Sequence, residues 1–377
     1  MKVVIAPDSF KESLSAKEVA SAIAEGWQKV LPDTECVCIP MADGGEGTVQ
    51  SLIDATKGRL QTVEVTAPLG NKIPAAFGIS GDRNTAIIEM AAASGLHLAP
   101  PEQRNPLITT SYGTGELIKA ALDEGVSKII LGIGGSATND AGAGMLQALG
   151  AVFLNSGNQS IGFGGSSLIH TTYADFSRLD KRLQQVEIEV ACDVDNPLCG
   201  EKGASAVFGP QKGATPAMVA ELDHALNHFA DIIFQYKGLD IRHCSGSGAA
   251  GGMGGGLLTL PNATLKSGVQ IVVEAVNLAQ AVRDADLVIT GEGRMDAQSV
   301  HGKTPVGVAG VAKQYGKPVI AIVGCLREDY EAVYQAGIDA VFPIIRQLDT
   351  LENVLANGRS NLVSAAQNIA KLYQMQR

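Results

Sequence analysis

The sequence predicts an α/β protein with two domains, and three observations support this prediction. Short apolar runs rich in Val and Ile recur along the chain, each followed by a turn and then by a helical pattern. Continuous apolar runs of this length, unlike alternating ones, are typical of strands that are buried on both faces of a parallel sheet. The length of 377 residues allows one large domain or two of ordinary size.

The expected strands are eight apolar runs, at residues 3–6, 35–40, 86–90, 128–133, 186–191, 287–290, 319–323 and 340–344. The expected helices lie between them, at residues 15–30, 46–56, 114–124, 140–149, 215–236, 304–315 and 351–373. The first helix starts with Ser15 followed three residues later by Glu18, which is the spacing of a capping box. This alternation of strand, turn and helix predicts parallel sheets.

Three segments interrupt the alternation. Residues 61–81 alternate between apolar and polar around a turn at residues 68–70, which predicts an antiparallel hairpin. Residues 155–167 and 243–256 are rich in Gly and Ser and have little periodicity, so they are expected to be loops. We therefore expect an inserted mixed-sheet α/β domain at residues 67–264, within a discontinuous α/β domain of residues 1–66 plus 265–377.

The composition excludes several classes of protein. Lys and Arg total 29 and Asp and Glu total 39, which gives a net charge of −10. No basic stripe with interleaved aromatic residues is present, so nucleic acid is not an expected partner. No apolar stretch reaches the roughly 18 residues of a membrane span and no leader precedes the first strand, so we expect a cytoplasmic protein. The 44 glycines form clusters without a period of three, which excludes collagen.

Carboxylates follow five of the expected strands, at the position where parallel α/β sheets bind ligands. They are Asp8, Asp43 with Glu46, Asp140, Asp193, and Glu292 with Asp296. Each one alone is explained by an ordinary cap or turn, whereas the set favours a metal and phosphate site or a general-base cluster. Three lysines beside small residues are candidates for neutralising phosphate charge, although a solvated surface lysine explains each of them equally well: Lys11, Lys212 and Lys303.

Glycines after the fourth strand allow the backbone to approach a phosphate, and the helix that follows would present its N–H groups to it. Gly134 and Gly135 are these glycines, and Ser136 and Thr138 either donate to the phosphate or cap the helix. Residues 302–304 spell the end of a Walker motif, but Ala297 stands where its first glycine is required. Residues 246–251 spell GxGxxG without a preceding strand or a closing acidic residue, and the role of the 246–256 loop stays open.

Six segments together resemble the type I glycerate kinase family, in order and over essentially the whole chain. They read VIAPDSFKES (4–13), PMADGGEGT (40–48), GIGGSATND (132–140), ACDVDNPL (191–198), GPQKG (209–213) and TGEGRMD (290–296). The resemblance implies ATP-dependent phosphorylation of D-glycerate, with the 2-phosphate favoured. It also implies one flavodoxin-like domain and a second α/β domain, with the active-site cleft between them.

The residues and the resemblance together suggest roles for the strand-end groups. Asp193 is the expected base, with Asp296 second, and Lys11 and Asp8 complete the expected catalytic set. Expected substrate-binding residues are Ser9, Ser13, Asp43 and Glu46, and expected magnesium ligands are Asp43, Glu46 and Asp193. Expected nucleotide or phosphate contacts are Gly44, Gly45, Gly134, Gly135, Ser136, Thr138, Asn139, Lys212, Gly291, Glu292 and Gly293.

Two other functions share parts of this pattern. A nicotinamide-dependent hydroxy-acid dehydrogenase has the same α/β alternation, but it needs a GxGxxG turn directly after a strand. A non-catalytic two-domain ligand-binding protein would not need so many carboxylates at strand ends. The sequence leaves the oligomeric state undetermined.

Overall fold

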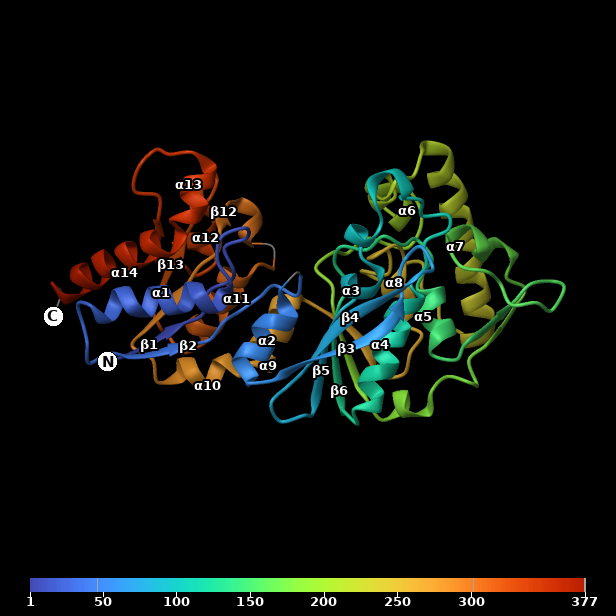
Figure 1. The fold of residues 1–377 in the computed structure, drawn as a ribbon, viewed down its shortest axis with the longest axis horizontal. Helices are drawn as coiled ribbons and strands as arrows, with labels where there is room; N and C mark the ends of the chain where they lie inside the picture. Colours follow the sequence, from blue (N-terminus) through green and yellow to red (C-terminus); the bar gives the residue numbers. More distant parts are fainter. Residues whose placement is uncertain (46, 301, 376–377) are drawn as a thin grey trace. The chain divides into compact units, whose positions relative to one another are not determined.

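The chain folds into two compact units, each of which is described here by itself (Figure 1). The computed structural model describes residues 1–45, 47–300 and 302–375. Unit 1 comprises Met1–Lys57 and Ser267–Arg377, and unit 2 comprises Gly58–Lys266. The first boundary therefore follows Lys57 and not residue 66, because the strand at residues 59–66 belongs to the sheet of unit 2.

Unit 1 is built on a five-stranded parallel sheet. Its strands are β1 (Lys2–Ile5), β2 (Glu35–Cys38), β11 (Leu287–Thr290), β13 (Val319–Val323) and β15 (Ala340–Pro343). Their spatial order is β15-β13-β11-β1-β2, and every neighbouring pair is parallel. Counted along the chain this is the order 2-1-3-4-5 of flavodoxin-like folds, which confirms that expectation. A short parallel pair, β12 (Arg294–Met295) with β14 (Cys325–Leu326), lies beyond the sheet.

The helices of unit 1 cover this sheet. They are α1 (Ala16–Gln28), α2 (Thr48–Thr56), α9 (Gly268–Ala275), α10 (Leu278–Arg283), α11 (Thr304–Gln314), α12 (Ala332–Gln335), α13 (Leu351–Ala356) and α14 (Gly358–Gln374), with a 3-10 turn η6 (Ala297–Val300). The capping box of Ser15 and Glu18 is present at the start of α1. Helices α1 and α14 lie side by side (Figure 1), because Gly26 of α1 lets the backbone of α14 approach closely at Val363.

Unit 2 contains a six-stranded mixed sheet in the expected inserted segment. Its strands are β3 (Arg59–Thr66), β4 (Lys72–Ile79), β5 (Thr85–Glu89), β6 (Lys128–Gly132), β9 (Glu187–Ala191) and β10 (Ala263–Lys266), in the order β10-β9-β6-β5-β4-β3. The antiparallel hairpin of β3 and β4 is confirmed, and β5, β6, β9 and β10 run parallel. A separate antiparallel pair is formed by β7 (Val152–Leu154) and β8 (Tyr173–Asp175).

The helices of unit 2 are α3 (Ala91–Ser94), α4 (Tyr112–Asp123), α5 (Ala143–Ala148), α6 (Ala204–Phe208), α7 (Pro216–Lys237) and α8 (Met253–Leu257). Its 3-10 turns are η1 (Leu96–Leu98), η2 (Pro101–Gln103), η3 (Gly165–His170), η4 (Lys181–Gln184) and η5 (Pro210–Lys212). None of the helices in the described ranges is both long and apolar enough to cross a bilayer.

Two helices differ from their expected ranges in a way that matters for function. Helix α5 begins at Ala143, not at residue 140, so residues 133–142 form an extended loop. The helix expected at 351–373 is two helices, α13 and α14, which are separated at Asn357. A Cβ on Gly358, the first residue of α14, would overlap the hydroxyl of Ser13, so this break lies where another loop passes.

The glycine cluster at residues 246–256 packs against backbone. A Cβ on Gly251 would overlap the carbonyl oxygen of Thr138, and one on Gly256 would overlap that of Ala141. The amide of Ala141 also donates to the carbonyl of Gly251 at 3.0 Å. Gly251 and Gly256 therefore lie where the 133–142 loop packs against the cluster, whereas Gly248 of the GxGxxG spelling meets the carbonyl of Pro197.

Replacing Gly251 by Ala tests this packing role. The change should lower the free energy of unfolding of unit 2 by about 3 kcal/mol, because it adds overlap with Thr138 to the strain of a left-handed residue at φ +69°. Gly238→Ala is the matched control, since Gly238 has the same φ with open space around it, and it should cost only about 1 kcal/mol. Equal losses in urea unfolding would contradict the packing role.

Candidate functional site

A pocket of about 460 Å³ lies at the carboxyl ends of the strands of unit 1. Segments that follow all five strands line it, from Asp8 after β1 to Ile345 after β15. The strand order reverses direction between β1 and β11, and this switch point is where open α/β sheets leave a crevice for ligands. The amide of Asp8 donates to the carbonyl of Gly291 at 2.8 Å, which ties the two central segments together.

Asp8 lies in this pocket at the switch point. One carboxylate oxygen accepts from the hydroxyl of Thr304 at 2.7 Å, and the other accepts from the amide of Ser9 at 2.6 Å. Burial raises the pKa of Asp8 to about 6, and the negative charge of Asp43 adds to the rise. A carboxylate whose pKa lies near neutrality is suited to accepting a proton.

Glu292, Lys303 and Asp296 form a charged network beside Asp8. The ammonium of Lys303 lies 3.4 Å from a carboxylate oxygen of Glu292 and 3.6 Å from one of Asp296. The hydroxyl of Ser299 donates to the other oxygen of Glu292 at 2.5 Å. Burial raises the pKa of Glu292, although both Ser299 and Lys303 favour its charged form. The network holds the ammonium of Lys303 in the lining of this pocket.

The loop after β1 brings its expected residues to the same pocket. Ser9, Lys11 and Ser13 line it, and Lys11 is exposed. The hydroxyl of Ser13 donates to the carbonyl of Leu355 at 2.6 Å, so Ser13 also fastens this loop to α13. Gly293 lines the pocket, while Gly291 is needed for packing, because a Cβ there would overlap the carbonyl of Ile322 in β13.

Asp43 lines the pocket from the segment after β2, and its carboxylate accepts from the amide of Gly45 at 3.0 Å. Gly44, at φ +89°, makes the tight turn that follows. Glu46, expected to bind substrate and metal, lies outside the described residues. Among residues 1–45, 47–300 and 302–375, no three His, Cys, Asp or Glu side chains are grouped in a way that could hold a metal ion.

The loop at residues 133–142 is the second expected site, and it belongs to unit 2. Gly134 and Gly135 are exposed, and Gly135 has φ +73°. Ser136, Thr138 and Asn139 are buried, and the side-chain amide of Asn139 donates to the hydroxyl of Ser205 at 2.9 Å. Main-chain groups of the two glycines are therefore the part of this loop that meets solvent.

Lys212 is buried under this loop, with 1% of its surface exposed. Its ammonium donates to the hydroxyl of Ser136 and to the carbonyl of Thr138, both at 2.7 Å. Burial lowers the pKa of Lys212 to about 7, and the charge of Asp140 opposes this change.

Asp140 is fully buried and accepts from the amide and hydroxyl of Ser111, at 2.9 and 2.8 Å, and from the amide of Gly142 at 3.2 Å. Lys212 and Asp140 shape the loop from inside.

Asp193 is exposed, two residues after the end of β9 in unit 2.

The pocket of unit 1 brings together seven of the expected residues: Asp8, Ser9, Lys11, Ser13, Asp43, Glu292 and Gly293. Sequence reasoning missed Thr304 and Ser299, which hold the two central carboxylates. The Gly302-Lys303-Thr304 sequence is the available signal for Thr304, although it is not part of a Walker motif.

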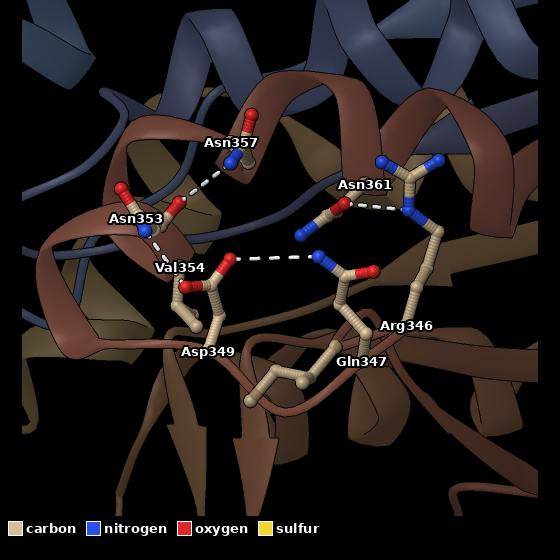
Figure 2. A pocket seen from close by; sticks show the side chains of 8 residues that line it. Arg346, Gln347, Asp349, Asn353, Val354, Asn357 and Asn361 are labelled. Carbon is tan, nitrogen blue, oxygen red and sulfur yellow. Dashed lines mark hydrogen bonds between the residues drawn. The ribbon is translucent and has the colours of Figure 1, made fainter.

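A second pocket of unit 1, of about 410 Å³, lies along α13 and the start of α14. Figure 2 shows Arg346 with its guanidinium directed to Asn361, where Nε donates to the amide oxygen at 2.7 Å. Asn353 donates to Asp349 at 2.7 Å on the other side of this pocket. The two pockets of unit 1 share Ile345 and Val354, so the segment 345–354 separates them.

The buried lysine predicts a pH dependence of stability. The pKa of Lys212 is about 7 in the folded protein and about 10.4 when exposed, so the unfolded chain binds more protons between these values. Burying Lys212 has almost no electrostatic cost above pH 10, where the side chain is neutral in both states. The cost grows, and the free energy of unfolding falls, as pH falls to 7. Relative to Lys212→Met, the free energy of unfolding of the unsubstituted protein should rise by about 2 kcal/mol from pH 7 to pH 9.

Urea unfolding at several pH values measures this difference. Lys202→Met is the control, because Lys202 is exposed in the same unit and its replacement should leave the pH profile unchanged. Parallel profiles for the unsubstituted protein and Lys212→Met would contradict the prediction.

Comparison with known proteins places the chain in a family. The model of the glycerate kinase family matches residues 3–374. A glycerate kinase of Haemophilus influenzae is 66% identical over 99% of this chain and 98% of its own length, and a glycerate 2-kinase of Escherichia coli is 55% identical over 98% and 97%. A crystal structure from Salmonella typhimurium LT2 that carries the name glycerate kinase 2 has a TM-score of 0.93 at 54% identity, over 100% of this chain and 99% of that one. The chain belongs to the glycerate kinase family.

Proposed function

We propose that this chain transfers the γ-phosphoryl group of ATP to the 2-hydroxyl of D-glycerate, which gives ADP and 2-phosphoglycerate. The observation that carries the proposal is the pocket of unit 1, where a carboxylate with a raised pKa and two lysines line one cavity at the switch point of a parallel sheet. The name glycerate 2-kinase of the Escherichia coli relative favours the 2-hydroxyl.

Asp8 is the base that the geometry of unit 1 supports best. The hydroxyl oxygen of glycerate attacks the γ-phosphorus, its proton passes to Asp8, and the bond from the γ-phosphorus to the bridging oxygen breaks to release ADP. Thr304 and Ser9 fix the carboxylate by hydrogen bonds of 2.7 and 2.6 Å. Asp296, by contrast, lies within ion-pair distance of both Lys303 and Arg294, which suits a counter-ion. Asp193, the base expected from the sequence, is the alternative candidate.

Lys303 and Lys11 supply positive charge for the phosphoryl group. Phosphoryl transfer depends mainly on positioning and on stabilising charge, so a lysine held in place is worth more than a mobile one. Glu292 and Asp296 hold Lys303 at 3.4 and 3.6 Å, and Ser299 orients Glu292. Lys11 is exposed, so its side chain can adopt the rotamer that contacts the bound phosphates.

Magnesium fits the acidic side of the same pocket. It would neutralise charge on the phosphate oxygens of the nucleotide, and such sites commonly use one or two carboxylates together with those oxygens. The charge of Asp43 raises the pKa of Asp8, and this crowding of like charges favours a cation. Asp43 would therefore hold the ion. In unit 2, the exposed main chain of Gly134 and Gly135 is proposed to contact an anionic group of a substrate.

An assay of ADP release tests the reaction itself. D-Glycerate should give ADP at a rate far above that with L-glycerate, lactate or glycolate, because L-glycerate has the opposite configuration at C2 and the other two acids lack the 3-hydroxyl that helps to position the 2-hydroxyl at Asp8. Phosphorus NMR should identify the product as the 2-phosphate. If ADP formation does not depend on glycerate, the proposed reaction is wrong.

Asp8→Asn tests the base. It should lower kcat by about 10²-fold or more while both KM values change little, because a proton acceptor is lost without loss of binding contacts. Asp329→Asn, an exposed carboxylate of unit 1 outside the pocket lining, is the control and should leave kcat unchanged. If Asp193→Asn abolishes turnover and Asp8→Asn does not, the base is Asp193.

A further inference from the structure

The pocket of unit 1 has two chemically different halves. Near β1 and β11 its lining carries three carboxylates, Asp8, Asp43 and Glu292, and three cations, Lys11, Arg294 and Lys303. Near β13 and β15 its lining is apolar and comes from the segment after β15 and from α13: Ile344, Ile345, Leu351, Val354 and Leu355. The proposed chemistry uses the charged half alone.

The apolar half is accessible, although it consists of aliphatic side chains. Leu351 is 70% exposed and Ile345 is 41% exposed, and both line the pocket. Aliphatic side chains that remain in water while they line a concavity are typical of a binding site for an apolar part of a ligand. We call the surface formed by Ile345, Leu351, Val354 and Leu355 the aliphatic wall.

The size of the pocket selects its occupant. D-Glycerate is a three-carbon acid without an apolar face, so it fills a small part of 460 Å³ and makes no use of the aliphatic wall. Cavities of roughly 300–1,000 Å³ suit ligands of nucleotide size. A nucleotide also has the same polarity as the pocket, with a flat base at one end and phosphates at the other.

We propose that the aliphatic wall binds the purine base of the phosphoryl donor, with the phosphates directed along the strand ends to Lys303 and Lys11. This inference rests on the proposed kinase function and adds to it the location of the nucleoside. The phosphates then reach the switch point, where Asp8 faces the acceptor hydroxyl.

The wall is held in place by contacts to the loop that carries the charged residues. The hydroxyl of Ser13 donates to the carbonyl of Leu355 at 2.6 Å, two residues along the chain from Lys11. Gly358 allows Ser13 to pass at the break between α13 and α14. The amide of Ile344, which directly precedes the aliphatic wall, donates to the carbonyl of Val323 at 2.9 Å and so extends the pairing of β13 and β15 up to the wall. Base and phosphate subsites are thus fixed relative to each other within one unit.

Photolabelling locates the base directly. The full-length protein is irradiated with 8-azido-ATP and magnesium, and the labelled peptide is identified by mass spectrometry. We expect the label within residues 344–358, with loss of label when excess ATP is present. Label that ATP displaces from residues 132–140, or from any other part of unit 2, would overturn the proposal.

Two variants and their controls measure affinity. Val354→Trp fills the pocket and should raise the Kd for ADP at least tenfold, whereas Ala356→Trp, on an exposed position of the same helix, should leave it within twofold. Leu351→Ser removes an exposed apolar contact and should raise the same Kd about threefold to tenfold. Leu348→Ser is its control, because Leu348 is fully exposed and lines neither pocket of unit 1 described above.

The same measurements separate this proposal from the proposed function. Calorimetric titration with ADP needs no turnover, so it reports on the wall even if glycerate is not the acceptor. An unchanged Kd for ADP in both Val354→Trp and Leu351→Ser would overturn the proposal, while glycerate-dependent ADP formation by the same variants would leave the kinase function intact. A raised KM for ATP with an unchanged KM for D-glycerate supports it.

Discussion

The pairing of β1 with β11 is the constraint on which the site of unit 1 depends. It aligns Val3–Ile5 with Leu287–Ile289, and so brings the segment after residue 5 next to the segment after residue 290. Asp8 and Thr304 are 296 positions apart in sequence and meet at 2.7 Å because of this pairing. Residues that are remote along the chain thereby become a single charged cluster, although the whole of unit 2 lies between them in the sequence.

Two buried charged groups near the candidate sites, Glu292 and Lys212, each lie near a group of opposite charge. Glu292 is buried, yet Lys303 and Ser299 both favour its ionised form. In unit 2, Lys212 faces the hydroxyl of Ser136 and the carbonyl of Thr138, and Asp140 nearby has the opposite charge. Removing one member of such a set leaves a desolvated charge, which costs more than the set contributes when it is complete. These groups therefore fix the geometry of the loops more than they add to stability.

Local patterns in the sequence predicted eight strands and the β3–β4 hairpin, but they did not predict β10, the β7–β8 pair, α9 or α10, and α8 begins within the loop expected at 243–256. The eight strands and the capping box of α1 follow from periodicity and spacing, and the strand-end carboxylates follow from topology. The burial of Lys212 could not be predicted, because the sequence around it is that of an exposed turn and the covering loop lies about 75 residues earlier. The break between α13 and α14 depends on Ser13, which no pattern within residues 351–373 reveals.

The polarity of the pocket follows from the order of the strands. Central strands end between two neighbours, so side chains just beyond β1 and β11 are partly buried and need partners, and charged groups that pair with one another occur there. The edge strand β15 has a neighbour on one side alone, so the chain beyond it can spread apolar side chains along an open rim. A ligand with a charged end and an apolar end is favoured in one orientation in such a pocket, because reversing it would place phosphates on aliphatic carbon and a base among charged groups. In the proposed binding mode, the sheet order thus sets both where transfer takes place and which end of the donor reaches that position.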